Sequence, residues 1–189
     1  MGDGWPSITY MTTEALLVVD HLDRCQDPLL LAEVELANNV SHARLRELMG
    51  GRSIARRAFQ LFGLAPMPIL ATTEGAPVWP HDLCGSISHS NRHVAVLIAR
   101  SSRYKSVGID VDDKRPLGEA AKASVVTERE LQAIDRAGLT ASGITAENIA
   151  FSAKEAVFKC QYPITLDASL DYLDVCLKPG KSPLSLGIQ

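Results

Sequence analysis

The stretch from 151 to 159, Phe-Ser-Ala-Lys-Glu-Ala-Val-Phe-Lys, constrains the fold most, because it combines charged and apolar side chains on one helical face. At roughly 100° per residue, a helix places five side chains on a single arc, in the order Lys154, Phe158, Phe151, Glu155 and Lys159. An ordinary amphipathic helix keeps charge off its apolar stripe. A carboxylate at the edge of a core suits a metal ligand or a general base, and neighbouring lysines suit anionic oxygens. The simpler alternative is a surface helix with a Glu–Lys pair one turn apart.

A second acidic motif, Val107-Gly108-Ile109-Asp110-Val111-Asp112-Asp113, alternates apolar and acidic residues. As a strand, this segment puts Asp110 and Asp112 on the same face. Two adjacent carboxylates repel each other unless a cation lies between them. Hard oxygen ligands without a neighbouring Cys/His set favour Mg²⁺, or Mn²⁺, over zinc. The alternative is a strand end that runs into a polar turn, which is the simpler interpretation for Asp112 and Asp113 taken alone.

A third segment, Trp79-Pro80-His81-Asp82-Leu83-Cys84-Gly85-Ser86-Ile87-Ser88-His89-Ser90, ends in a cluster of small polar residues. Residues 85–89 predict a short strand, and His89 lies where this strand opens into the polar turn at 90–92. Backbone and hydroxyl donors at such a point can bind a phosphate. The alternative is that His89 is only a structural hydrogen-bonding residue.

An arginine-rich stretch precedes these motifs. Asp27 and Pro28 predict the N-cap and first residue of a helix that runs to about Leu48 and stops at Gly50-Gly51. A second helix is predicted from about Ser53 to Phe62, ended by Gly63. Glu47 alone opposes a set of basic residues here, namely Arg44, Arg46, Arg52, Arg56 and Arg57. Arg52 is expected at the start of the second helix, where free N–H groups favour an anion, and the alternative is a solvated basic face.

Other local signals complete a mixed layout. Strands at about 84–89 and 93–99 predict a hairpin, and Thr127-Glu128-Arg129-Glu130 is a capping box that starts a short helix. A loop is expected at 138–143, and the helix that contains Glu155 is expected to end before Pro163. Residues 170–177 and 184–188 predict strands. Helices and strands in both halves indicate the α+β class.

Composition bounds the function without identifying it. The 189 residues are 46% hydrophobic, which is enough for one good-sized core or two small ones. The net charge of −3 argues against a general nucleic-acid binder. No apolar run reaches the length of a membrane span and the first residues lack a basic leader, so we expect a cytoplasmic protein. The cysteines at 25, 84, 160 and 176 have no C-x-x-C spacing, which favours buried, reduced thiols.

Taken together and in order, G-S-I-S-H-S, V-G-I-D-V-D and F-S-A-K-E-A-V-F-K closely resemble the 4′-phosphopantetheinyl transferases. The resemblance is to the surfactin-type branch, and within it to the bacterial subgroup similar to enterobactin synthetase component D. Residues 44–59 resemble the R…E…GR-x-x-A-R segment of that subgroup, and residues 75–80 match its G-x-P-x-W-P motif. The likeness spans about residues 40 to 165.

The resemblance implies a pseudo-two-fold fold with two similar α/β halves and an active site at their interface. We expect an N-terminal half at 1–98 and a C-terminal half at 99–189, forming a single compact catalytic unit that acts as a monomer. The implied reaction moves 4′-phosphopantetheine from coenzyme A to a serine of an apo acyl- or peptidyl-carrier protein, with adenosine 3′,5′-bisphosphate as the other product. Such carriers serve polyketide, nonribosomal peptide and siderophore biosynthesis. No nucleic-acid or membrane partner is expected.

Residue roles follow from the same resemblance. Asp110, Asp112 and Glu155 are the expected Mg²⁺ ligands, with Asp112 at a position where the family usually has a glutamate. Glu155 is the expected base for the carrier serine, and Lys159 is expected to stabilise the leaving phosphate, so that Asp110, Glu155 and Lys159 form the catalytic set. His89 is expected on the 3′-phosphate of coenzyme A. The full expected coenzyme A set is Arg44, Arg52, Arg56, Ser88, His89, Lys154 and Lys159.

Two alternatives stay open. The first is a Mg²⁺-dependent phosphohydrolase that acts on a nucleotide, which would release inorganic phosphate without any carrier protein. The second is a non-catalytic coenzyme A-binding protein, which would bind coenzyme A without changing the mass of a carrier.

Overall fold

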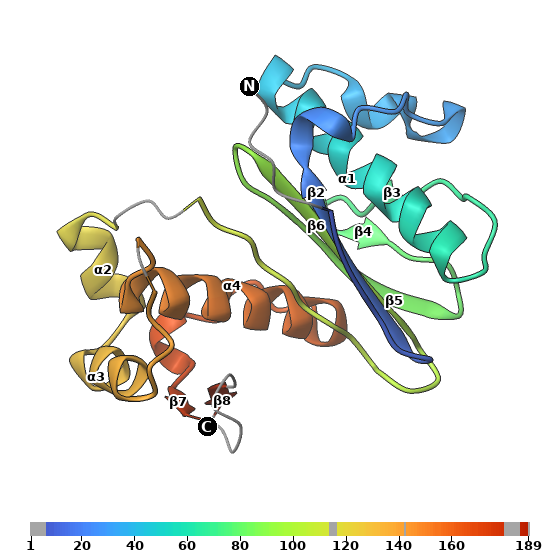
Figure 1. Cartoon of the computed structure of the whole chain (residues 1–189). Coiled ribbons are helices and arrows are strands. Elements are labelled where there is room, and N and C mark those ends of the chain that lie inside the picture. Colours follow the sequence, from blue (N-terminus) through green and yellow to red (C-terminus); the bar gives the residue numbers. More distant parts are fainter. Residues whose placement is uncertain (1–6, 114–116, 142, 180–185, 189) are drawn as a thin grey trace.

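The first half of the chain forms a four-stranded antiparallel sheet with one long helix on one face (Figure 1). The computed structural model describes residues 7–113, 117–141, 143–179 and 186–188. The strand order is β1-β2-β6-β5, and every neighbouring pair is antiparallel. The elements of this half are β1 (Ile8–Met11), β2 (Ala15–His21), the 3₁₀ helices η1 (Leu22–Arg24) and η2 (Leu31–Ala37), α1 (His42–Leu61), β3 (Leu70–Ala71), β4 (Pro77–Val78), β5 (Leu83–His89) and β6 (His93–Arg100).

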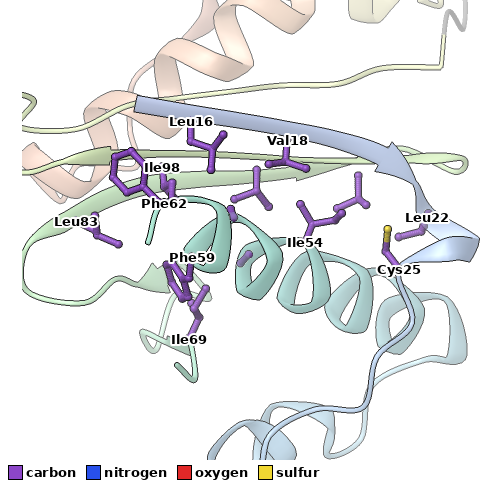
Figure 2. Packing of buried hydrophobic residues seen from close by; sticks show 14 residues of the cluster. Leu16, Val18, Leu22, Cys25, Ile54, Phe59, Phe62, Ile69, Leu83 and Ile98 are labelled. Atoms are coloured by element: carbon purple, nitrogen blue, oxygen red, sulfur yellow. The ribbon is translucent and has the colours of Figure 1, made fainter. Parts of the chain in front are cut away.

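The core of this half lies between α1 and the sheet. Leu16 and Val18 alternate with half-buried residues along β2, so both point to the α1 side, where they meet Ile54 of α1 (Figure 2). Phe59, near the C-terminal end of α1, is fully buried. Burying one such side chain contributes roughly 1.5–3 kcal/mol, so this cluster fixes the helix on the sheet. The predicted hairpin is confirmed, with β5 and β6 joined by a turn at 90–92.

The two helices predicted around Gly50-Gly51 are a single helix, so that prediction was wrong. α1 starts after Ser41, whose hydroxyl accepts from the N–H of Arg44, and runs through both glycines. Glycine costs about 1 kcal/mol in a helix interior. Here it permits close packing, because a Cβ on Gly50 would lie 2.2 Å from Cδ1 of Leu22. Tertiary contact therefore overrides the local helix-breaking signal.

The start of the predicted first helix was wrong as well. The segment after Asp27 forms the 3₁₀ helix η2 instead of an α-helix. Asp27 does not cap a helix there, and its carboxylate accepts a 2.6 Å hydrogen bond from the Ser53 hydroxyl. Gly63 is confirmed as the residue after the C-terminus of α1, with a φ of +78°.

The second half consists mainly of helices. Its elements are α2 (Glu119–Val125), α3 (Glu128–Arg136), α4 (Ala146–Thr165), the 3₁₀ helix η3 (Tyr172–Asp174), β7 (Leu177–Pro179) and β8 (Leu186–Ile188). Ile134 and Ala150 are fully buried members of a second hydrophobic cluster between α3 and α4. In Figure 1, α4 spans the distance between the α2–α3 pair and the sheet. The α+β class is confirmed, and the described part of this half contains a smaller, two-stranded sheet.

Two predicted boundaries in this half differ from the structure. α4 continues past Pro163 to Thr165 and ends at Leu166, which adopts a left-handed conformation with a φ of 56°. Proline removes only one N–H in the last turn, so the helix tolerates it. Residues 170–177 are not one strand, because the Asp171 side chain accepts from the N–H of Leu173 and starts η3. β8 covers only 186–188 of the predicted 184–188 strand, and residues 184–185 lie outside the described ranges.

The capping box at Thr127 is confirmed, with hydrogen bonds in both directions between Thr127 and Glu130. The cysteines at 25, 84, 160 and 176 are all free. None of the helices in the described ranges combines the length and apolar character required to cross a membrane.

Candidate functional site

An extended segment after β6, residues 107–113 (the crossing segment), lies on the face of β5 opposite α1 and brings Asp110 to the site. Ser86 and Ser88 accept hydrogen bonds from the backbone N–H groups of Ile109 and Val111, each at 3.2 Å. The strand predicted at 107–113 is therefore wrong, because serine hydroxyls take the place of a backbone ladder. The same alternation still places Asp110 beside Ser88, whose hydroxyl donates to Oδ1 of Asp110 at 2.8 Å.

Gly108 lets this crossing segment lie directly against α4. A Cβ at this position would be 1.9 Å from the carbonyl oxygen of Ala156 and 2.9 Å from Cβ of Cys160. The close approach brings Asp110 beside α4, where Nζ of Lys159 lies 2.6 Å from Oδ1 of Asp110. Lys159 also donates to the Ser88 hydroxyl at 3.0 Å. Asp110 from the crossing segment and Lys159 from α4 thus meet over the end of β5.

A cavity of about 430 Å³ opens at this junction. Most of the predicted site residues line it together. They are Ser88, His89, Asp110, Asp112, Glu155 and Lys159. Residues far apart in sequence, from β5, the crossing segment and α4, therefore form one site.

Each of the three predicted metal ligands has a protein partner. Asp110 accepts from Lys159, and Oδ2 of Asp112 accepts from the Asn148 side chain at 3.2 Å. Glu155 accepts through Oε1 from the hydroxyl of Tyr172. Within the described ranges, no three His, Cys, Asp or Glu side chains are close enough to hold one metal ion. The three carboxylates have the oxygen donors that Mg²⁺ prefers and line one cavity, and they would have to move closer together to bind one ion.

Tyr172 and His89 are both affected by burial. Burial raises the pKa of Tyr172 well above its ordinary value, and the hydrogen bond to Glu155 adds to this effect. Burial lowers the pKa of His89, against the opposing charge of Glu47. Nε2 of His89 lies 3.2 Å from Nη1 of Arg44 and 3.4 Å from the Glu47 carboxylate. The N-terminal turn of α1 thereby places an arginine beside His89, which lines the cavity.

Arg52 and Arg56 are not brought to this cavity. Arg52 lies in the middle of α1 rather than at a helix start, so the predicted free N–H groups are absent there. Its guanidinium is almost fully buried and donates to the carbonyl of Ile69 at 2.9 Å. Arg56 pairs with buried Glu33 at 3.1 Å. The coenzyme A role of both arginines remains a prediction, and the structure gives both guanidinium groups other partners.

Lys154 also points away from the cavity. It is 1% exposed, and its Nζ lies 2.8 Å from Glu130, which is 2% exposed. The same amine donates to the carbonyls of Val125 and Tyr172, each at 2.9 Å. The helical arc predicted Lys154 on the same face as Glu155, but the Lys154 side chain points toward Glu130 of α3. Its observed contacts are those of a structural ion pair.

Tyr172 and Asn148 are site residues that sequence reasoning did not find. Each donates to a predicted metal ligand, Tyr172 to Glu155 and Asn148 to Asp112. Asn148 also forms the capping box that starts α4 with Thr145, a sequence signal that indicates a cap and no more. No local pattern points to Tyr172, because its contact with Glu155 depends on how η3 packs on α4.

Comparison with known proteins agrees with the two-part layout. The model of the 4′-phosphopantetheinyl transferase N-terminal domain matches residues 32–99. The model of the 4′-phosphopantetheinyl transferase superfamily matches residues 106–185. The second of these ranges includes the segment that contains Asp110.

Curated relatives show the same likeness. The 4′-phosphopantetheinyl transferase Svp of Streptomyces mobaraensis is 36% identical over 165 residues, which cover 83% of this chain and 65% of Svp. Enterobactin synthase component D of Escherichia coli (strain K12) is 30% identical over 149 residues, which cover 78% of this chain and 69% of that protein. The chain belongs to the 4′-phosphopantetheinyl transferase superfamily.

The match to this superfamily is partial in length. The chain spans 65% of the length of Svp, less than two thirds. A solved holo-(acyl-carrier-protein) synthase from Bacillus anthracis str. Ames, in complex with CoA (3′,5′-ADP), aligns with a TM-score of 0.40 and 18% identity. That alignment covers 47% of this chain and 95% of the synthase.

Proposed function

We propose that the protein transfers 4′-phosphopantetheine from coenzyme A to a serine of an apo acyl- or peptidyl-carrier protein. The main support is the cavity that gathers acid, base and phosphate-binding side chains from both halves of the chain. Membership of the superfamily supports the same reaction. The second product would be adenosine 3′,5′-bisphosphate.

Coenzyme A phosphates would bind at the end of the cavity lined by His89, next to the first turn of α1. Arg44 and His89 lie 3.2 Å apart there and offer charged and neutral donors to an anion. His89 is our choice for the 3′-phosphate, with Ser88 and Lys159 nearer the pyrophosphate. The buried positions of Arg52 and Arg56 favour indirect roles, in which they support α1.

Asp110, Asp112 and Glu155 would hold Mg²⁺, with Mn²⁺ as a substitute. When bound, the ion would offset negative charge on the pyrophosphate oxygens. The protein donors that now occupy these carboxylates include Lys159, whose amine lies 2.6 Å from Asp110. Both Lys159 and a divalent ion can therefore neutralise the same carboxylate.

The protein side chains would handle the protons of the transfer. Glu155 would accept the proton of the carrier serine hydroxyl, which is a weak nucleophile until it is deprotonated. The serine oxygen then forms a bond to the phosphorus that bears pantetheine, and the P–O bond to adenosine 3′,5′-bisphosphate breaks. Lys159 would stabilise the negative charge on that leaving phosphate. One rigid helix carries both groups, since both belong to α4.

The decisive experiment incubates the protein with coenzyme A, Mg²⁺ and a panel of apo-carrier proteins, and follows intact carrier mass. We expect a mass gain of one phosphopantetheine group, and its loss in Glu155→Gln with coenzyme A binding retained. Release of inorganic phosphate without a carrier would instead indicate a phosphohydrolase. Coenzyme A binding with no mass change for any carrier would indicate a non-catalytic binding protein.

A further inference from the structure

Tyr172 contacts the proposed catalytic carboxylate from outside the set of motif residues. It is the first residue of η3, and its hydroxyl donates to Oε1 of Glu155. Glu155 lies on the wall between two cavities. The larger, of about 430 Å³, contains Asp110 and Lys159, while the smaller, of about 240 Å³, is lined by Tyr172. A flexible glutamate at such a boundary needs a fixed partner to keep one orientation.

The tyrosine itself is held firmly. Its ring packs on Phe151 of α4, with ring centroids 5.9 Å apart. Its backbone carbonyl accepts from Nζ of Lys154 at 2.9 Å, and that amine is paired with buried Glu130. Both ends of Tyr172 are thus tied to consecutive residues of α4, the backbone to Lys154 and the hydroxyl to Glu155. The buried ion pair therefore supports the hydroxyl that contacts the catalytic side chain.

One hydrogen bond leaves a carboxylate free to act. An ionised carboxylate has roughly four acceptor positions, and the Tyr172 hydroxyl uses one of them on Oε1. The remaining positions are available to a metal ion or to the proton of a substrate. Partners that fix a ligand in this way typically change metal affinity by about 10–100-fold when they are removed.

We propose that Tyr172 is a positioning residue that orients the Glu155 carboxylate for metal binding and proton transfer. The inference rests on the proposed function of Glu155. It adds a residue from η3, an element that none of the sequence motifs includes, to the catalytic site.

The test removes only the hydroxyl. Tyr172→Phe keeps the ring contact with Phe151, and Tyr104→Phe, at an exposed tyrosine outside the cavity, is the matched control. We expect Tyr172→Phe to weaken Mn²⁺ binding by about tenfold, measured by electron paramagnetic resonance on protein without coenzyme A or carrier. We also expect kcat to fall by about tenfold, with KM for coenzyme A and carrier nearly unchanged. Unchanged Mn²⁺ affinity and kcat would overturn the proposal.

A double-mutant cycle separates positioning from a general structural effect. In a Glu155→Ala background, Tyr172→Phe should cause no further loss of Mn²⁺ affinity, because its effect passes through Glu155. An equal loss in both backgrounds would overturn the proposal and indicate a structural role. If Glu155→Ala itself leaves Mn²⁺ affinity and turnover unchanged, the assignment of Glu155 in the proposed function fails first, and the role of Tyr172 fails with it.

Discussion

Two lysines on α4 have different environments and therefore different expected roles. Lys154 is fully buried and paired with Glu130, whereas Lys159 is partly exposed and lies beside Asp110 in the cavity. Taking a charge out of water is costly, so a buried ammonium persists only when it is paired and hydrogen-bonded. Lys154 meets that condition with one carboxylate and two carbonyls. The resemblance assigns both lysines to coenzyme A binding, whereas their burial indicates a structural role for Lys154 and a site role for Lys159.

We predict that Lys154→Met lowers the free energy of unfolding by about 3–5 kcal/mol, because it leaves the Glu130 carboxylate buried without its cation. Lys159→Met, on the same helix, should lower the free energy of unfolding much less while it abolishes most of the turnover. Urea unfolding followed by circular dichroism and a carrier-mass assay measure the two effects. If Lys154→Met keeps wild-type stability but loses turnover, Lys154 acts in the proposed active site rather than as a structural ion pair.

At the scale of elements, the contact between the crossing segment and α4 creates the site. Gly108 is the point of closest approach, and Asp110 follows two residues later along the same segment. The serines of β5 hold this segment from the other side. The geometry of the Asp110–Lys159 ion pair therefore depends on Gly108, which has no side chain.

Gly108→Ala should separate the segment from α4, because the new Cβ would overlap the Ala156 carbonyl. We expect a loss of about 1–3 kcal/mol in the free energy of unfolding and a large loss of turnover. Gly118→Ala is the control, since a Cβ there meets no atom within 4 Å. Equal turnover in the two variants would show that the segment can shift without harming the site.

The contact between α2 and α4 gives a pH-dependent prediction. The hydrogen bond from Lys122 lowers the pKa of Glu147 to about 2, and the two side chains lie 2.7 Å apart. The depressed pKa means that this pair stabilises the fold fully above about pH 4.5, and that the stabilisation is lost as the pH falls toward about 2. Glu147→Gln should therefore lower the free energy of unfolding by about 1 kcal/mol at neutral pH, since the pair is partly exposed.

Urea unfolding of wild type and Glu147→Gln, from about pH 6 down to about pH 3, measures this effect. The difference between the two proteins should shrink as the solution becomes acidic. A difference that stays constant over this range would mean that the charge of Glu147 contributes nothing to stability.

At the scale of the whole molecule, the residues that the structure describes form two separate hydrophobic clusters. One lies between α1 and the four-stranded sheet, and the other lies between α3, α4 and the segment that follows α4. The cavity with Asp110 and Lys159 lies where the two parts meet. A ligand bound there contacts both parts, so binding should couple their stabilities.

Hydrogen exchange can test this organisation. Ile134→Ala, in the second cluster, should cost about 2–5 kcal/mol and speed amide exchange in α3 and α4 more than in β2 and β6. Ile54→Ala, in the first cluster, is the matched variant and should show the reverse pattern. Uniform acceleration across the chain in both variants would instead indicate a single cooperative unit.

Local signals in the sequence were enough to predict several features of the fold. The β5–β6 hairpin, the capping box at Thr127 and the end of α1 at Gly63 follow from turn and cap chemistry that acts within a few residues. The motifs also contain most of the charged and polar residues that line the cavity, among them His89 and Asp110. These features depend on residue type and short spacing, which a sequence displays directly.

Packing between distant segments decided the rest. α1 passes through Gly50 because Leu22 fills the space where a Cβ would lie, and Ser86 and Ser88 replace the strand partner expected for the crossing segment. Lys154 pairs with Glu130 instead of lining the predicted phosphate site, and the Tyr172 hydroxyl donates to Glu155. Each of these outcomes balances desolvation, hydrogen bonding and close packing between parts of the chain that are far apart in sequence, so only the tertiary structure could decide it.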